Sequence, residues 1–170
     1  VKKHVYKPVN RLVDDLVDIV SKNGCLLLNI GPKPDGTIPE HEQQMLREIG
    51  RWLDVNGQAI YGTRPWKQYG EGPTGTATGH LSENKNKAFT AEDIRFTTKG
   101  HVLYAIVLDW PEDDELVIKS LRGDGDPAIK SVMLLGSGNP LAWEQKATGL
   151  QVSLPAQKPC EHAFVLRIEQ

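Results

Sequence analysis

The chain has 170 residues, which suits one or two domains. Its 20 basic and 22 acidic residues give a formal net charge of -2, and the basic residues are scattered along the chain. Neither a nucleic acid nor an anionic membrane surface is therefore expected as a partner. The apolar runs are too short to span a bilayer.

The first four residues lead into a polar stretch and not into the apolar core of a signal peptide. Because the chain does not begin with Met, we expect its natural start to lie elsewhere, and the compartment stays open. The two cysteines, Cys25 and Cys160, lie far apart and form neither a disulfide framework nor a zinc pattern. We expect both to be free thiols, and we expect no metal and no cofactor.

A helix is predicted over residues 8–22, where apolar residues recur at helical spacing. Asn23 and Gly24 supply the left-handed residues that commonly end a helix. The polar side of this helix carries three carboxylates, which we interpret as a solvated face: Asp14, Asp15 and Asp18.

A strand is predicted over residues 25–30, followed by a turn-rich loop and a second helix over residues 39–55. The strand is apolar on both faces, which is typical of a parallel sheet covered by helices. Helix, buried strand and helix together indicate a piece of a βαβ-type architecture. This strand needs parallel neighbours, and the chain offers none.

Residues 69–88 are polar and rich in glycine, which predicts a long connection. After it the apolar period changes to two, and residues 94–98 and 101–110 predict a hairpin. Further short strands are expected at residues 115–121, 129–135, 150–154 and 163–168. Their spacing indicates an antiparallel sandwich or open barrel, large enough to hold a small core of its own.

Two stretches are more specific than any periodicity. One contains LVDIVSKNGCLLLNIGPKPDGTIP and REIGRWLDVNGQAIYGTRPW, between residues 16 and 66, and the other is SENKNKAFTAEDIRFTTKGHVLYAIVLDWP, residues 82–111. Both resemble the C-terminal part of α-L-fucosidases of glycoside hydrolase family 29, closely over the larger part of the chain and loosely over the rest.

The resemblance implies a fold that joins an α/β part to an all-β part. Residues 1–68 would form the last helix, strand and helix of a (β/α)8-like catalytic barrel, and residues 69–90 a connecting segment. Residues 91–170 would form a C-terminal antiparallel β-sandwich that braces the barrel. The resemblance implies two partners for this chain, the remainder of the barrel and a fucosylated glycan substrate. A periplasmic, secreted or lysosomal location is compatible with this family.

The family removes terminal α-L-fucose with retention, through an Asp nucleophile and a Glu acid/base. Retaining chemistry needs two carboxyl groups about 5 Å apart. The resemblance places both residues before the segment where this chain begins, so we assign no catalytic residue here and expect the chain alone to be inactive. The other carboxylates are interpreted as parts of turns and loops: Asp35, Glu112, Asp113, Asp114, Asp124 and Asp126.

Three residues are candidates for weaker roles. Barrel active sites form at the carboxyl ends of the strands, so Leu26 and Asn29 are candidates for the rim of the substrate pocket. The family often has an aromatic residue at the position of Leu26, so an apolar wall is kept here while ring stacking is lost. Plain packing of Leu26 and a structural role for Asn29 in clamping the loop stay open. Trp143 is a candidate sugar contact, with packing as its alternative.

Two other functions remain open. The sandwich could be a carbohydrate-binding module without catalysis, although only Trp143 is a good aromatic candidate. The chain could also dock with a second chain that carries the first barrel strands, because an unpaired apolar strand at residues 25–30 is an aggregation hazard.

Overall fold

The computed structural model describes residues 6–75, 87–123 and 128–170. Two α-helices come first, α1 (Val9–Ser21) and α2 (Glu40–Asn56), followed by the short 3-10 helix η1 (Gly57–Ala59). The strands are β1 (Arg64–Glu71), β2 (Ile94–Lys99), β3 (Val102–Val107), β4 (Glu115–Ile118), β5 (Ser131–Leu134), β6 (Ala142–Lys146), β7 (Gly149–Ser153) and β8 (Phe164–Glu169). Within the described residues no helix is both long enough and apolar enough to cross a membrane.

The strands form two antiparallel sheets that face each other. The larger sheet has the order β1-β2-β3-β8-β5, and the smaller has the order β4-β7-β6. The predicted hairpin is confirmed, because β2 and β3 pair from Ile94 opposite Val107 to Lys99 opposite Val102. The predicted antiparallel sandwich is confirmed as well.

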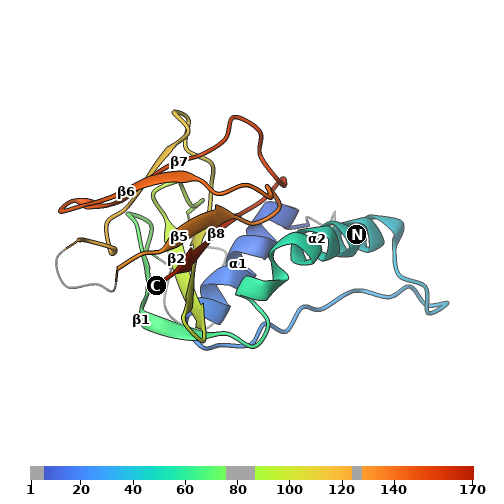
Figure 1. The fold of residues 1–170 in the computed structure, drawn as a ribbon. Helices are drawn as coiled ribbons and strands as arrows, with labels where there is room; N and C mark the ends of the chain where they lie inside the picture. The colour runs from blue at the N-terminus through green and yellow to red at the C-terminus, as the bar shows by residue number, and fades with distance from the viewer. Residues whose placement is uncertain (1–5, 76–86, 124–127) are drawn as a thin grey trace.

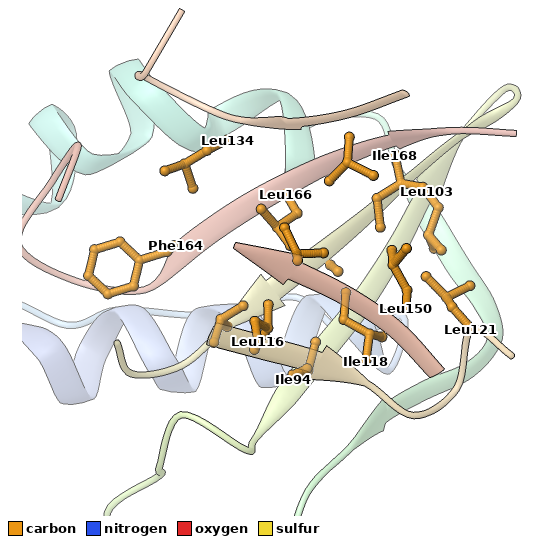
Figure 2. Close-up of a cluster of buried hydrophobic side chains, with 14 of the residues drawn as sticks. Ile94, Leu103, Leu116, Ile118, Leu121, Leu134, Leu150, Phe164, Leu166 and Ile168 are labelled. Atoms are coloured by element: carbon orange, nitrogen blue, oxygen red, sulfur yellow. The ribbon is translucent and has the colours of Figure 1, made fainter. Parts of the chain in front are cut away.

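The core of the sandwich lies between the two sheets, and Figure 2 shows its apolar side chains pointing toward one another. β3 contributes Leu103 and Ala105 to this core, because alternate side chains of a strand point to the same face. The residues between them, Tyr104 and Ile106, point to the opposite face and are equally buried. The larger sheet is therefore covered on both faces.

The two helices cover that second face (Figure 1). Val13 and Val17 of α1 and Trp52 of α2 share one apolar cluster with Tyr104 and Ile106. The helices and the sandwich thus form three layers around two cores. The sandwich has a core of its own between the two sheets, as expected. The expectation missed that the other face of the larger sheet is also apolar and is covered by the helices.

One side of α2 holds the segment that leads into β8. The indole N–H of Trp52 donates to the carbonyl oxygen of Ala163 at 2.7 Å, and Nε2 of His162 lies 3.0 Å from Oε1 of Glu48. Asn56, one turn beyond Trp52, lies with its Nδ2 3.6 Å from Sγ of Cys160. These three helix positions are four residues apart and so share one face of α2.

The expected strand over residues 25–30 is not formed in the structure. The segment runs as an irregular trace between α1 and α2 in Figure 1, and Leu27 is 86% exposed. A strand requires a hydrogen-bonded neighbour, and none of the described strands pairs with this segment.

Two edge strands were missed by the sequence reasoning, β1 and β6. β1 crosses the expected boundary at residue 68 and pairs with β2, so the first residues of the expected connection, 69–71, belong to the larger sheet. The rest of that connection includes residues 76–86, which lie outside the described residues. The turn with Asp124 and Asp126 lies outside them too.

The expected solvated face of α1 is wrong for two of its three carboxylates. Asp14 is only 3% exposed and Asp18 only 9%, while Asp15 is half-buried. The face of α1 that carries Asp14 and Asp18 is the face turned toward the larger sheet, where Arg95 of β2 meets Asp18.

Candidate functional site

A groove of about 550 Å³ lies between the segment after α1 and the side of α2 that faces away from the sheet. Its wall is mainly apolar, and its lining residues are Tyr6, Lys7, Leu12, Leu27, Leu28, Asn29, Ile30, Gly31, Glu42, Met45, Leu46 and Ile49. Asn29, one of the two predicted rim residues, lies in this wall and is exposed. Leu26, the other, is half-buried and is not among the lining residues.

Glu42 is the one carboxylate among the described residues that line the groove. It lies in the first turn of α2, where the partial positive charge of the helix N-terminus favours an anion. Its Oε2 accepts a hydrogen bond from the backbone N–H of Gly31 at 2.9 Å, and its Oε1 accepts one from the Tyr6 hydroxyl at 3.3 Å. Desolvation and the nearby negative charge of Glu42 raise the pKa of Tyr6.

The contacts of Glu42 hold the loop after residue 30 against the helix. Sequence reasoning missed this residue, although its position near the start of a helix, just after a loop rich in proline and glycine, is a recognisable signal. One carboxylate beside an amide and an apolar wall can orient a polar ligand. It cannot by itself supply both an acid and a nucleophile.

A second groove, of about 570 Å³, lies at one end of the sandwich. It is formed by the loop between β5 and β6 and the loop after β7, and its lining residues are Gly136, Ser137, Asn139, Pro140, Leu141, Ala142, Ser153, Leu154, Pro155, Gln157, Lys158 and Pro159. No carboxylate and no aromatic ring belongs to this described lining.

Trp143, the predicted sugar contact, lies on β6 and lines neither groove. Along β6 the half-buried residues Trp143 and Gln145 alternate with the exposed residues Ala142, Glu144 and Lys146. Trp143 therefore points inward, and its ring packs against the core between the sheets. This placement favours the packing interpretation.

The other tryptophans also make internal contacts. The ring of Trp66 packs edge-on against Phe96, with 5.0 Å between ring centroids. The indole N–H of Trp110 donates to Oδ1 of Asp114 at 2.7 Å. Each indole thus has a partner inside the fold, as buried tryptophans usually do.

Metal-binding groups are not gathered at either groove. Within residues 6–75, 87–123 and 128–170 there is no cluster of three or more His, Cys, Asp or Glu side chains that could hold an ion. Both cysteines are free thiols, Cys25 at the surface and Cys160 half-buried. Burial raises the pKa of the Cys160 thiol above its ordinary value.

Comparison with known proteins gives two family matches along the chain. Residues 1–58 match the family model described as α-L-fucosidase, and residues 86–169 match the model described as α-L-fucosidase C-terminal domain.

Two curated relatives illustrate the extent of the match. The chain is 34% identical over 169 residues to an α-L-fucosidase of Branchiostoma floridae, a match that covers 96% of this chain and 33% of the relative. It is 35% identical over 173 residues to the human plasma α-L-fucosidase, covering 96% of this chain and 32% of the relative. The chain spans about a third of the length of these curated relatives.

Solved structures agree with this. The crystal structure of the Thermotoga maritima α-fucosidase is similar with a TM-score of 0.76 at 31% identity, and the match covers 98% of this chain and 36% of that chain. A second structure of that enzyme, in complex with a mechanism-based inhibitor, matches with a TM-score of 0.75 at 32% identity and covers 96% of this chain and 34% of that chain.

Proposed function

The chain belongs to the α-L-fucosidase family of glycoside hydrolases, and from this premise we propose that it is part of an enzyme that removes terminal α-L-fucose from glycans with retention. In this proposal the two helices and the segment between them complete the catalytic barrel, while β1 together with residues 91–170 forms the bracing sandwich. The main support for this proposal is that one chain matches two family models, the α-L-fucosidase model first and the C-terminal domain model after it.

The catalytic carboxylates are proposed to lie outside this chain. A retaining glycosidase needs two carboxyl groups about 5–5.5 Å apart, one to attack the sugar and one to protonate the leaving oxygen. The apolar groove offers Glu42 among its described residues, and both of its oxygens are occupied by Tyr6 and Gly31. Asp14 and Asp18 are buried against the sheet, out of reach of a glycan. The chain by itself is accordingly expected to be inactive.

The remainder of the barrel is the proposed partner of the groove. Leu27, Leu28 and Ile30 are exposed apolar side chains on a short segment beside the groove. Contiguous apolar surface of this kind usually marks an interface. Parallel strands on both sides of residues 25–30 would bury these side chains and satisfy the backbone of the segment. In a split enzyme, a second chain would supply those strands and would bury the same apolar side chains.

Leu26 and Asn29 remain the proposed rim of the fucose pocket. In a barrel the carboxyl ends of the strands line the active site, and residues 25–30 end at the Gly31 loop that Glu42 holds. Asn29 would offer an amide to a sugar hydroxyl, and Leu26 an apolar wall. The exposure of Asn29 in the groove supports this placement.

The sandwich is proposed to brace the barrel by covering its helices. Its larger sheet shares an apolar cluster with α1 and α2, and the contacts of Trp52 and Glu48 fasten α2 to the segment before β8. The carbohydrate-binding alternative is not favoured, because Trp143 packs inward and none of the described residues that line the groove at the end of the sandwich is aromatic.

The test is an assay with an aryl α-L-fucoside on two samples, the natural full-length protein and the 170-residue chain alone. We expect turnover by the full-length protein, with the first product an α-anomer by NMR, and none above background by the chain alone. Turnover by the chain alone would place a catalytic pair within it. If the full-length protein is folded, as judged by circular dichroism, and still shows no turnover, the proposed activity is wrong.

A further inference from the structure

Asp14 is a buried carboxyl in the layer where α1 meets the larger sheet. Only 3% of the residue is exposed. Its Oδ2 accepts a hydrogen bond from Nδ2 of Asn10 at 3.1 Å, and its Oδ1 is buried with no hydrogen-bond partner. A buried carboxylate without a cation is costly, so such a group usually takes up a proton.

The nearby cations are engaged by other carboxylates. Nε of Arg95 lies 2.6 Å from Oδ1 of Asp18, and Nζ of Lys22 lies 2.7 Å from its Oδ2. Nε of Arg11 lies 3.1 Å from Oδ1 of Asp15. No ion pair within the described part of the chain includes Asp14.

The net effect of the surroundings of Asp14 on its pKa is in the same direction. The pKa of Asp14 is raised from 3.8 to about 7, and burial is the largest cause. The negative charges of Asp15 and of Asp109, which follows β3, also raise this pKa, whereas the positive charges of Arg11 and Arg95 lower it. β1, which also packs on α1, presents the ring of Tyr69 to Lys22 at 4.7 Å and to Arg95 at 5.6 Å. α2 contributes no charge to this set.

We propose that Asp14 is a proton-dependent latch between α1 and the larger sheet: the neutral carboxyl is tolerated in the interface, and its ionisation loosens the helix. Val13, Val17 and Asp18 also hold the docked helix to the sheet, so ionisation of Asp14 shifts the balance toward a released helix without abolishing the docked state. It rests on the fold of the described residues and not on the proposed fucosidase activity.

The sign of the effect follows from the two states of the group. A released helix exposes Asp14, which then ionises near its ordinary value of 3.8, while the docked helix keeps the proton up to about pH 7. The docked state is therefore favoured in acid and loses that advantage as the pH rises through about 7. Between about pH 5 and about pH 8 the docking equilibrium should fall about a hundred-fold.

The experiment measures hydrogen exchange of the α1 backbone amides in the natural full-length protein at about pH 5 and about pH 8, corrected for intrinsic exchange. The variants are Asp14→Asn, which carries the neutral shape at every pH, and Asp54→Asn, a matched control at an exposed position of α2. We expect protection of α1 to fall about a hundred-fold in the wild type and in Asp54→Asn, and to stay level in Asp14→Asn.

A direct titration keeps the proposal testable if Asp14→Asn does not fold. The side-chain carboxyl of Asp14, followed by carbon NMR in the wild type, should titrate near pH 7. A midpoint near the ordinary value of 3.8 would overturn the latch. So would an equal loss of α1 protection in the wild type and in Asp14→Asn.

Discussion

Replacing Arg95 by Met tests whether the ion pair between β2 and α1 holds the helix layer on the sheet. Arg95 is 3% exposed, and its Nε lies 2.6 Å from Oδ1 of Asp18, which is 9% exposed. Met keeps an unbranched apolar stem. The substitution removes the guanidinium, and with it the positive charge, its cation–π contact with Phe89 and its hydrogen bond to the carbonyl oxygen of Ile94.

The expected cost follows from what Asp18 keeps. Removing one partner of a buried ion pair costs about 3–5 kcal/mol, because the other charge stays buried. Asp18 retains Lys22 at 2.7 Å, whose side chain reaches solvent. We therefore expect the low end, about 3 kcal/mol, for Arg95→Met.

The double variant Arg95→Met/Asp18→Asn separates the ion pair from packing. With both charges gone, much of the loss should be recovered, because a buried pair replaced by neutral groups is often close to neutral in stability. Urea unfolding of the two single variants and the double variant at neutral pH gives the coupling free energy, which we expect to exceed about 1.5 kcal/mol. A coupling free energy near zero would mean that the Arg95→Met loss is a packing effect and that the ion pair does not hold α1 on the sheet.

Three further predictions concern other contacts of the helices and of the larger sheet. Trp52→Ala should lower the free energy of unfolding by about 3–5 kcal/mol in urea. Trp52→Phe should lower it by clearly less, because Phe keeps most of the packing and loses only the hydrogen bond to the carbonyl oxygen of Ala163. Equal losses for the two variants would contradict this. Asp93→Ala should cost about 1–3 kcal/mol by thermal unfolding, because its carboxylate accepts hydrogen bonds from Thr74 and Thr90, with exposed Glu112→Ala as the control. Burial alone would raise the pKa of Asp93, but these hydrogen bonds lower it, so its contribution should be present above about pH 4 and lost in stronger acid, where a flat pH profile would argue against it. Residues 64–170, which keep β1 but lack the helices, should bind a hydrophobic dye and lack a cooperative melt, because the helix-facing side of the larger sheet would be bare. A sharp melt would mean that the sandwich holds itself together.

The helices and the hairpin were predictable because their signals are local. α1 and α2 have apolar residues at helical spacing, and their ends fall close to the predicted ones, at Ser21 and Asn56. The β2–β3 hairpin follows from two apolar runs separated by a turn in which Gly100 has a positive φ of 60°. Each of these signals operates over a few residues and depends little on distant contacts.

The edge strands were not predictable from such signals. β1 is mostly exposed and contains Pro65 and Gly70, residues that weaken a strand assignment but are tolerated at a sheet edge. β6 alternates half-buried and exposed residues, but among them only Trp143 is strongly apolar. Both strands exist because a neighbouring strand, β2 or β7, offers a row of backbone partners.

Of the two rim residues that the sequence predicted, Asn29 lines the groove and Leu26 does not, and their role at a fucose pocket stays a prediction. Glu42 was missed because its significance depends on two contacts, one of them to the distant Tyr6. Trp143 was a candidate sugar contact, but the pairing of β6 with β7 turns its ring inward.

The two helices, the hairpin and the resemblance to the fucosidase family could be recognised in the sequence, because helical period, turn residues and long motifs are local features of the chain. The double cover of the larger sheet and the burial of Asp14 and Asp18 depend on how distant segments pack together. The physical reason is that a carboxylate on a helix faces water or protein according to what lies opposite. For α1 that is Arg95, a residue 77 positions from Asp18 in the chain.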